Sequence, residues 1–286
     1  MLKPIKKIPE TWSHLTNEEI YEIYKSEIKH SNRLRIDDKK VRQSLYQTVY
    51  DDYFSELPFH PTFHFRKKEK IKKDRIEFLI KKLSPLLTGS EKFIEIGAGD
   101  CSLSYELSDY VDKVYALEVS DVTVNKNYTK PENMEIIIFN GYDFPFEKGS
   151  IDFAFSNQLL EHLHVDDAIE QTCSVYNSLK KGGKYMCITP NRLLGPGDIT
   201  GYFGDELKGF HLKEYTSMEL RSVFKSTGFR KVKFQSIIKG KSVFIPMCII
   251  WIIEKCISIL SKKNRTKVLK NRLISIIFNS VIIAIK

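Results

Sequence analysis

The chain of 286 residues can bury a full core, and its 42% hydrophobic and 28% charged residues exclude wholesale disorder. The formal net charge is +9, but it is uneven, because residues 239–286 hold ten Lys or Arg residues and one acid, Glu254. A neutral body with a basic tail argues against a general nucleic-acid-binding protein, which more often spreads positive charge over one face. We therefore expect no nucleic-acid partner.

The first 85 residues are predicted to be helical. Thr16-Asn-Glu-Glu19 has the form of a helix capping box, and residues 37–54 space their apolar side chains helically. Residues 56–65 contain two prolines and indicate a loop. Residues 66–87 predict a third helix, whose lysines form a solvated face.

From residue 92 onward, short apolar strands alternate with helices. The predicted strands are 92–96, 113–119, 134–139, 151–156, 184–189 and 230–238. The predicted helices are 100–110, 166–179 and 216–227, and a turn is expected at 180–183. This alternation is typical of a parallel, doubly wound sheet.

The segment FIEIGAGDCSLS reads as a strand, a glycine turn and a helix. Gly97 and Gly99 allow a tight turn that approaches a ligand, and Glu118 ends the next strand, where an acid can bind ribose hydroxyls. A dinucleotide and S-adenosylmethionine both fit this pattern. Asp100 at the helix start would repel a diphosphate, so the pattern favours S-adenosylmethionine, which has no phosphate.

Residues 93–238 resemble the class I S-adenosylmethionine-dependent methyltransferases. FIEIGAGDC is similar to the first motif of that family, with Cys101 in place of the last glycine, and VYALEVS is similar to the second. FNGYDFPFEKGSIDFAFSNQLLEH, LKKGGKYMCITPN and GFHLKEYTSMELRSVFKSTGF resemble three later motifs in the same order. Lys181 stands where the fourth motif has proline.

The resemblance implies an α/β fold, with a doubly wound, mostly parallel seven-stranded Rossmann-like sheet. We expect an N-terminal helical lid or substrate region at 1–85, a cofactor-binding core at 86–238, and a basic apolar helical insertion at 239–286 that ends in the last strand, SVIIAIK. Tyr46, Tyr50, Tyr53 and Phe54 form a helical stripe in the lid. The stripe packs in a core or lines an acceptor pocket.

The resemblance also implies a set of cofactor contacts around one crevice. Glu118 would bind the ribose, the side-chain oxygen of Asn140 the adenine amino group, and the Gly97–Gly99 turn with Glu95 the methionine end. The full set of expected contacts is Glu95, Gly97, Ala98, Gly99, Asp100, Glu118, Val119, Asn140, Gly141, Tyr142, Asn157 and Gln158.

Two histidines are the candidate bases for the reaction. His162 follows the fourth strand, and either borders the methyl group or holds its loop by a backbone hydrogen bond. His211 follows a glycine-rich loop that can close over the crevice, and either acts on the substrate or caps the next helix. His164 is expected to be scaffolding. His60 and His64 could reach the site only if the lid covers it.

A metal site is not expected in the cluster Glu161, His162, His164, Asp166 and Asp167. Neither helical nor extended spacing gathers three of these side chains on one side, and we expect no distant Cys or His pair to complete the set. The two aspartates instead suit the start of the next helix, where negative charge favours the dipole.

The segment 239–278 joins an apolar stretch, VFIPMCIIWII, to a basic one, SKKNRTKVLKNR. Eleven apolar residues before Glu254 are too few to cross a bilayer. The segment packs on the body or on a second subunit of a homo-oligomer, or it lies on an anionic membrane. We favour packing.

The sequence therefore predicts an enzyme that transfers methyl from S-adenosylmethionine to a small-molecule or glycan acceptor, at oxygen. Two alternatives remain: a membrane-associated lipid or quinone methyltransferase anchored by the tail, and a non-catalytic cofactor-binding module. The five scattered cysteines form no zinc-type pairs, and no apolar stretch follows the basic first residues. We expect a cytoplasmic protein, at most peripheral at the inner face of the membrane.

Overall fold

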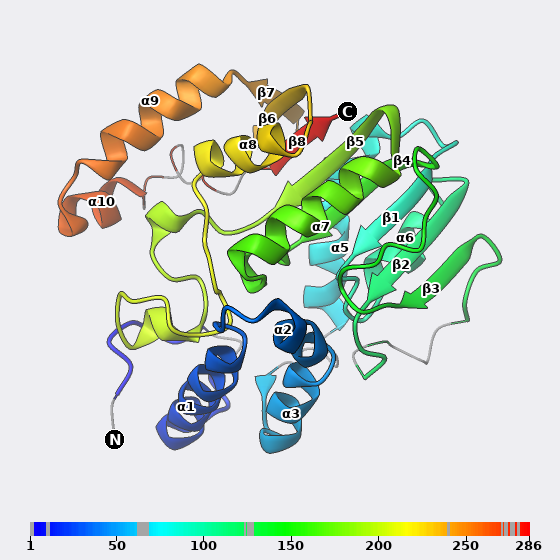
Figure 1. The fold of residues 1–286 in the computed structure, drawn as a ribbon. Coiled ribbons are helices and arrows are strands. Elements are labelled where there is room, and N and C mark those ends of the chain that lie inside the picture. Colours follow the sequence, from blue (N-terminus) through cyan, green and yellow to red (C-terminus); the bar gives the residue numbers. More distant parts are fainter. Residues whose placement is uncertain are drawn as a thin grey trace.

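The computed structural model describes residues 3–9, 12–61, 69–122, 124, 129–238, 241–269, 271, 274, 278 and 281–286. One sheet runs through the molecule, with helices on both of its faces (Figure 1). His64 and parts of the segment 239–278 lie outside the described residues.

The strands are β1 (Lys92–Ile96), β2 (Lys113–Glu118), β3 (Met134–Ile138), β4 (Ile151–Asn157), β5 (Leu179–Ile188), β6 (Lys231–Ile238), β7 (Lys241–Ile245) and β8 (Val281–Ile285). Their order across the sheet is β3-β2-β1-β4-β5-β8-β6-β7. Neighbours from β3 to β5 pair in parallel, and β8 pairs antiparallel with both β5 and β6. The predicted doubly wound, mostly parallel fold is confirmed.

Two details of the predicted sheet are wrong. The sheet has eight strands rather than seven, because Lys241–Ile245 form β7 in the segment that was expected to be helical. Its Val, Phe and Ile side chains favour a strand, and β7 pairs antiparallel with the outer edge of β6. The expected turn at 180–183 belongs instead to β5, whose register against β4 shifts between Ile151 and Phe153.

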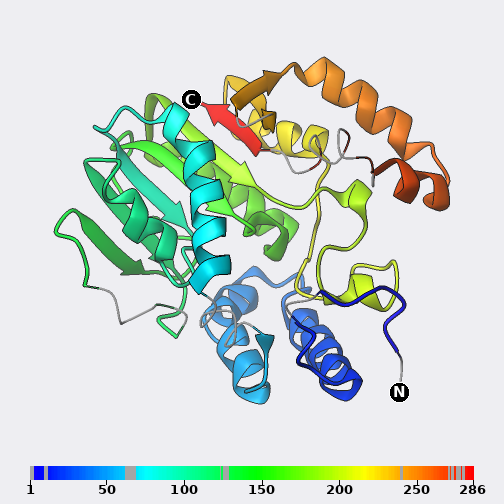
Figure 2. The same ribbon diagram turned by 180° about the vertical axis from the view of Figure 1, so that it is seen from behind.

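Two apolar clusters hold helices on opposite faces of the sheet. The helices α5 (Glu69–Leu83) and α6 (Ser102–Leu107) lie on the face that carries Phe93. The helices α7 (Val165–Ser178) and α8 (Ser217–Ser226) lie on the face that carries Ile94 (Figures 1 and 2). Neighbouring strand residues point to opposite faces, which explains why nearly every side chain of β1 is buried.

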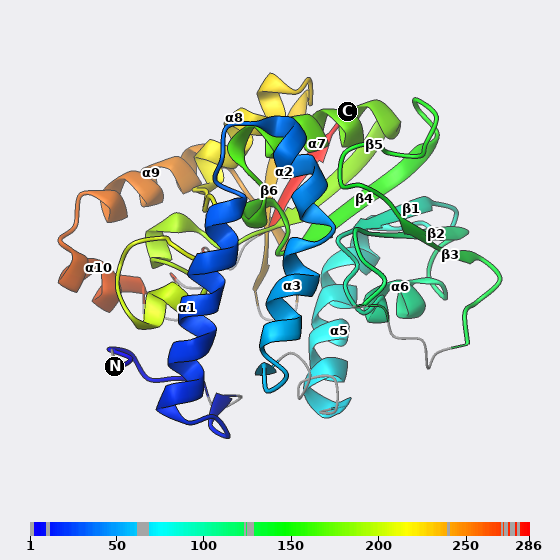
Figure 3. The ribbon, with the colours of Figure 1, turned by 60° about the horizontal axis from the view of Figure 1, so that its bottom comes forward.

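Three N-terminal helices, α1 (Asn17–Arg33), α2 (Lys39–Tyr46) and α3 (Val49–Glu56), lie together beyond the sheet (Figure 3). The capping box at Thr16 is confirmed, since Thr16 and Glu19 exchange both hydrogen bonds. The single helix predicted over 37–54 is two helices, interrupted at Gln47 and Thr48. The aromatic stripe therefore runs from the end of α2 into α3.

A buried ion pair joins these helices to the sheet domain. Nε and Nη2 of Arg42 lie 2.8 and 3.0 Å from the two carboxylate oxygens of Asp167 in α7, and both side chains are 1% exposed. The hydroxyl of Tyr46 donates to the same carboxylate, and the backbone N–H of His164 donates to that hydroxyl. Asp167 thus begins α7, as expected, and also fixes the position of α2.

The C-terminal helices α9 (Met247–Ser258) and α10 (Lys262–Leu269) follow β7. The buried carboxylate of Glu254 accepts hydrogen bonds from the backbone N–H groups of Ser217 and Met218 and from the side chain of Asn191. It therefore caps the start of α8 and holds α9 against the body, which supports the packed interpretation of this segment. Among the described residues, no helix is both long and apolar enough to cross a membrane.

Removing one partner of the buried ion pair between Arg42 and Asp167 is expected to destabilise the protein more than replacing both partners. Arg42→Ala leaves a buried carboxylate without its partner, so we expect the free energy of unfolding, measured by urea titration, to fall by about 3–5 kcal/mol. The double variant Arg42→Met/Asp167→Leu should recover much of this loss. Arg33→Ala removes an exposed pair with Asp52 and should cost less than ~1 kcal/mol. Equal losses for Arg33 and Arg42 would contradict this account.

Candidate active site

Two cavities that share Gly97 lie at the carboxyl ends of β1, β2 and β4. The first has a volume of ≈ 200 Å³ and is lined by Glu118, Val119, Gly141, Tyr142 and Gln158. The second has a volume of ≈ 430 Å³ and is lined by Glu95, Ala98, Gly99, Asp100 and Asn157. Eleven of the twelve expected cofactor contacts therefore line one of these two cavities.

Glu118 joins the glycine turn to the end of β2. Its carboxylate accepts hydrogen bonds from the backbone N–H of Gly99 at 2.7 Å and of Val119 at 2.8 Å. Burial raises the pKa of Glu118, and these backbone donors oppose that effect. Glu118 lines the first cavity, and a carboxylate oxygen can accept more than one hydrogen bond, so the group can still accept hydrogen bonds from a pair of ribose hydroxyls.

The glycine turn has a left-handed backbone at three places, Gly97, Gly99 and Cys101. Gly97 has φ +70°, and a Cβ there would meet Leu159 at 3.1 Å. Cys101, which stands where the resembled motif has glycine, adopts φ 60° and begins α6. A glycine would hold this conformation without strain, so Cys101 retains the geometry of the turn at some cost in stability.

Asn140 is the expected contact that lines neither cavity. Its side chain is exposed, and Oδ1 accepts hydrogen bonds from the backbone N–H groups of Tyr142 and Asp143. The side chain therefore shapes the loop rather than facing the cavity, and the neighbours Gly141 and Tyr142 line it instead. A side-chain oxygen that already accepts two backbone hydrogen bonds is poorly placed to bind an adenine amino group.

The second cavity contains basic side chains that the sequence did not single out. Lys72 and Arg75 of α5 line it, and Nζ of Lys72 lies 2.7 Å from Oδ2 of Asp100. Burial disfavours the ionised carboxylate of Asp100, but hydrogen bonds from Lys72 and Ser102 outweigh this effect, so the pKa of Asp100 is lowered. Burial raises the pKa of Glu95 to about 8. The lysine-rich helix was interpreted as a solvated face, and only the fold brings it to the glycine turn.

A third cavity, of ≈ 310 Å³, lies between the N-terminal helices and residues 197–211. Its lining includes Trp12, Tyr53, His60, Tyr202 and Phe210. Tyr50, Phe54 and His162 line both this cavity and the first one. These three side chains therefore stand at the boundary between the two spaces, and the aromatic stripe serves both as packing and as cavity wall.

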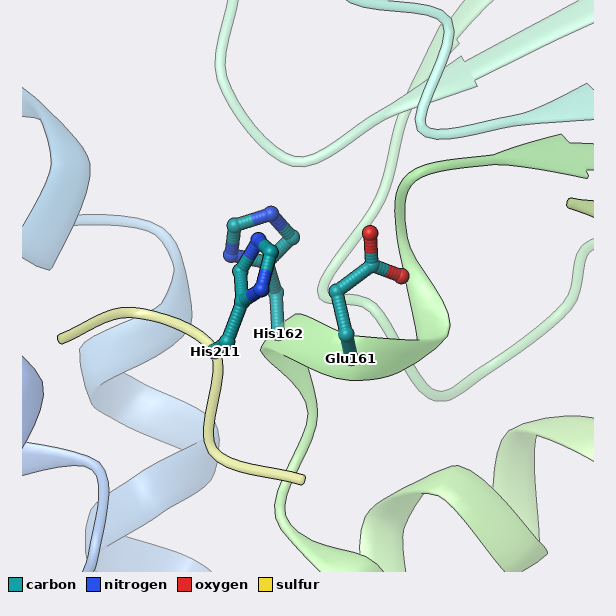
Figure 4. A group of neighbouring side chains, drawn as sticks. All are labelled: Glu161, His162 and His211. Atoms are coloured by element: carbon teal, nitrogen blue, oxygen red, sulfur yellow. The ribbon is translucent and has the colours of Figure 1, made fainter. Parts of the chain in front are cut away.

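Figure 4 shows that His162 and His211 face each other, with the carboxylate of Glu161 beside them. The ring centroids of the two histidines lie 4.9 Å apart, at 89° to each other. Glu161 and His162 belong to a short 3-10 helix, η3 (Leu160–His162), that follows β4. The backbone N–H groups of Leu212 and Lys213 donate to the carbonyl of Glu161, and this brings His211 to the site.

The two histidines differ in their surroundings. Nδ1 of His211 lies 2.7 Å from Oε1 of Glu214. Burial alone would lower the pKa of His211, but the carboxylates of Glu214, Glu161 and Asp198 outweigh that effect, so the pKa is raised. Burial and the charge of His211 lower the pKa of His162 to about 3. Burial also raises the pKa of Glu161 to about 7.

His164 and Asp166 lie at the start of the next helix. His164 is the N-cap of α7, and Asp166 lies in the exposed first turn. This agrees with the expectation that His164 is scaffolding. The spacing argument against a metal cluster considered this stretch alone and did not foresee His211, which lies 49 residues further along the chain and forms a group of three possible metal ligands with Glu161 and His162.

Residues 94–187 match a family model described as a methyltransferase domain. A comparison with curated proteins finds no match. Solved structures with the same fold include the methyltransferase bound to the Trm112 activator of Haloferax volcanii (16% identity, TM-score 0.54, 77% of this chain and 93% of that one). Another is an S-adenosylmethionine-dependent methyltransferase of Archaeoglobus fulgidus (16% identity, TM-score 0.52, 78% of this chain and 99% of that one).

The methyltransferase domain at residues 94–187 and the fold shared with these structures support a class I S-adenosylmethionine-dependent methyltransferase. Its cofactor is S-adenosylmethionine, and its residues fit that molecule. A Cβ at Gly99 would project into open space, and Glu118 offers its carboxylate to the first cavity. The alternative of a non-catalytic cofactor-binding module is set aside.

We expect Glu118→Ala to weaken the binding of S-adenosylmethionine by at least about tenfold in isothermal titration. Loss of hydrogen bonds to a charged acceptor costs roughly 1.5–3 kcal/mol, and 1.4 kcal/mol corresponds to a factor of ten. Glu135→Ala, an exposed change on β3, is the control and should leave affinity unchanged. Unchanged affinity in Glu118→Ala would remove this residue from the cofactor site.

Proposed function

We propose that this enzyme methylates a hydroxyl oxygen of a small-molecule or glycan acceptor that binds in the third cavity. The observation that carries the proposal is the wall shared by the cofactor and third cavities, where Tyr50, Phe54 and His162 line both. An acceptor in the third cavity would meet the cofactor across this wall. Held in line with the methyl group, its nucleophilic atom gains the rate advantage of proximity.

The cofactor is held, in this proposal, by residues from three parts of the chain. Glu118 accepts the ribose hydroxyls, and the backbone around Gly141 and Tyr142 lies along the adenine. The carboxylate of Asp100 suits the ammonium group of the methionine end, Glu95 can accept a hydrogen bond from it, and Arg75 suits the carboxylate of that end. The bound cofactor supplies a methyl group on a sulfonium: the carbon–sulfur bond breaks as the carbon–oxygen bond forms, and the hydroxyl proton leaves.

The third cavity favours an acceptor with a flat or ring-shaped apolar face and several hydroxyl groups. Trp12, Tyr202 and Phe210 offer aromatic faces. Burial raises the pKa of Glu27 to about 8 and lowers the pKa of His60 to about 4, which favours the uncharged form of both groups. A protonated carboxyl and a neutral imidazole both donate and accept hydrogen bonds, as hydroxyl recognition requires.

His162 and His211 are proposed to meet the acceptor oxygen: His211 takes up its proton, and His162, whose pKa of about 3 makes it a weak base, holds the oxygen by a hydrogen bond. Both line the third cavity, and His162 also lines the cofactor cavity. The contact between His211 and Glu214 sets the orientation of the His211 ring. The glycine-rich loop that precedes His211 is packed against this ring, since a Cβ at Gly197 would lie 3.2 Å from it.

A screen of nucleotide-sugar and phenolic acceptors for uptake of labelled methyl tests this proposal. On an identified acceptor, we expect His162→Ala and His211→Ala each to lower turnover by about 100-fold or more, since positioned proton transfer contributes 10²–10⁴-fold. The affinity for S-adenosylmethionine should change less than about threefold. His164→Asn, which preserves a helix cap, is the matched control and should retain full turnover. Full turnover in the double variant His162→Ala/His211→Ala would refute the assigned roles.

The second candidate is a lipid or quinone methyltransferase that rests on a membrane through its tail. It is supported by the exposed apolar side chains of Trp251 (48%), Ile252 (52%) and Ile259 (83%), which precede the basic helix α10. Apolar side chains beside lysines suit an anionic lipid surface. A second copy of the chain would cover the same face in a homo-oligomer.

For this candidate, Trp251→Ser/Ile252→Ser is expected to reduce co-sedimentation with anionic vesicles at least about fivefold, because each apolar side chain contributes roughly 1.5–3 kcal/mol when buried. The control is Val41→Ser, which changes an exposed apolar side chain on α2. Raising the salt concentration should weaken binding further. Equal partitioning of the variant and the unaltered protein would exclude the membrane contact.

A further inference from the structure

Two buried polar atoms of adjacent residues have no hydrogen-bond partner among the described residues. They are Oε1 of Glu161 and Nδ1 of His162. A buried polar atom without a hydrogen bond costs about 1–3 kcal/mol, and two of them on adjacent residues call for an explanation. A metal ion that both atoms coordinate would explain them, and the neighbouring side chains support this explanation.

A third donor completes the group. Glu214 occupies the Nδ1 side of the His211 ring, so Nε2 of His211 remains available. One ligand atom from each of Glu161, His162 and His211 can be chosen so that all three lie within 4.8 Å of one another. Metal–ligand bonds of about 2.0–2.2 Å at tetrahedral angles place ligand atoms about 3.3–3.6 Å apart, so the three atoms have to approach one another by up to about 1.5 Å to close the site.

The partners behind these ligands have the arrangement that metal sites use. A carboxylate on the far nitrogen of a metal-bound histidine fixes its tautomer, and Glu214 takes that place at His211. The hydroxyl of Thr189 donates to Oε2 of Glu161 at 2.8 Å and leaves Oε1 free. The backbone N–H of Gly197 donates to Oε1 of Glu214 at 2.6 Å, which holds that carboxylate in place.

We propose that Glu161, His162 and His211 bind a divalent transition-metal cation. Two imidazoles and one carboxylate suit Zn²⁺, Fe²⁺ or Mn²⁺ better than Mg²⁺ or Ca²⁺, which prefer oxygen ligands. Three protein ligands leave coordination positions open, as in catalytic rather than structural sites. His162 and His211 line the third cavity, so the open positions face the space assigned to the acceptor.

This inference rests on the proposed function for its role in the reaction. A cation at this place would bind the acceptor hydroxyl oxygen and lower its pKa, and the proton would pass to solvent water. The oxygen would then gain the methyl carbon as the sulfur loses it. The histidines would act together through the cation, rather than one of them acting alone as a base.

Metal binding can be measured without any acceptor. The full chain, with no affinity tag, is stripped with a chelator and titrated with Zn²⁺ against a chromophoric competitor. One site per chain is expected, and Glu161→Gln, His162→Ala and His211→Ala should each weaken it at least about 100-fold. Glu214→Gln should weaken it about 10–100-fold, as a lost support of a ligand does. His164→Asn is the matched control and should bind as the unaltered protein does.

Binding of S-adenosylmethionine by each variant shows that it has folded. The inference is overturned if stripped protein that binds S-adenosylmethionine takes up no stoichiometric Zn²⁺, or if Glu161→Gln binds Zn²⁺ as tightly as His164→Asn. It is also overturned if methylation of an identified acceptor persists in chelator, in which case the histidines act directly and the proposed function stands. A Zn²⁺ site with the expected variant pattern, but no methylated hydroxyl acceptor, would uphold the site and refute the proposed function.

Discussion

The hydrogen bonds from the backbone of Leu212 and Lys213 to the carbonyl of Glu161 are the contact on which the site depends. They join the end of β4 to the segment before α8, and they bring His211 against His162. Because donor and acceptor are backbone groups, this contact fixes the path of the backbone and does not depend on which side chains these residues carry. The Arg42–Asp167 pair then positions the N-terminal helices over the same edge of the sheet, which encloses the third cavity.

The fold and the cofactor site were largely predictable because they follow from local patterns. Each parallel strand is a short apolar run, and the glycine turn and Glu118 stand at fixed distances from strand ends. The predictions that failed are those that depend on pairing or on loop conformation. β7 forms because β6 offers it an edge, and Asn140 turns away because its own loop uses its side-chain oxygen. Lys72 meets Asp100 only once α5 packs beside the glycine turn.

The histidines show which contacts residue spacing can predict and which it cannot. His162 and His164 have different surroundings, as expected, but not through a shared helix: η3 ends at His162, and extended backbone at Leu163 leads to His164, the N-cap of α7. Residue spacing carries no information about His211, since its approach depends on the loop from Gly195 to Gly209. Cys101 is a second case: the sequence shows a departure from the resembled motif, and the structure shows that the backbone keeps the left-handed conformation a glycine would adopt there.

The central claim is that the cofactor and the acceptor meet at the wall formed by Tyr50, Phe54 and His162. A crystal structure with S-adenosylhomocysteine bound tests it most directly. The account predicts the adenine beside Gly141 and Tyr142, the ribose on Glu118, and the sulfur directed toward His162 and the third cavity. A sulfur atom directed away from that wall, toward α5 and Arg75, would contradict the account.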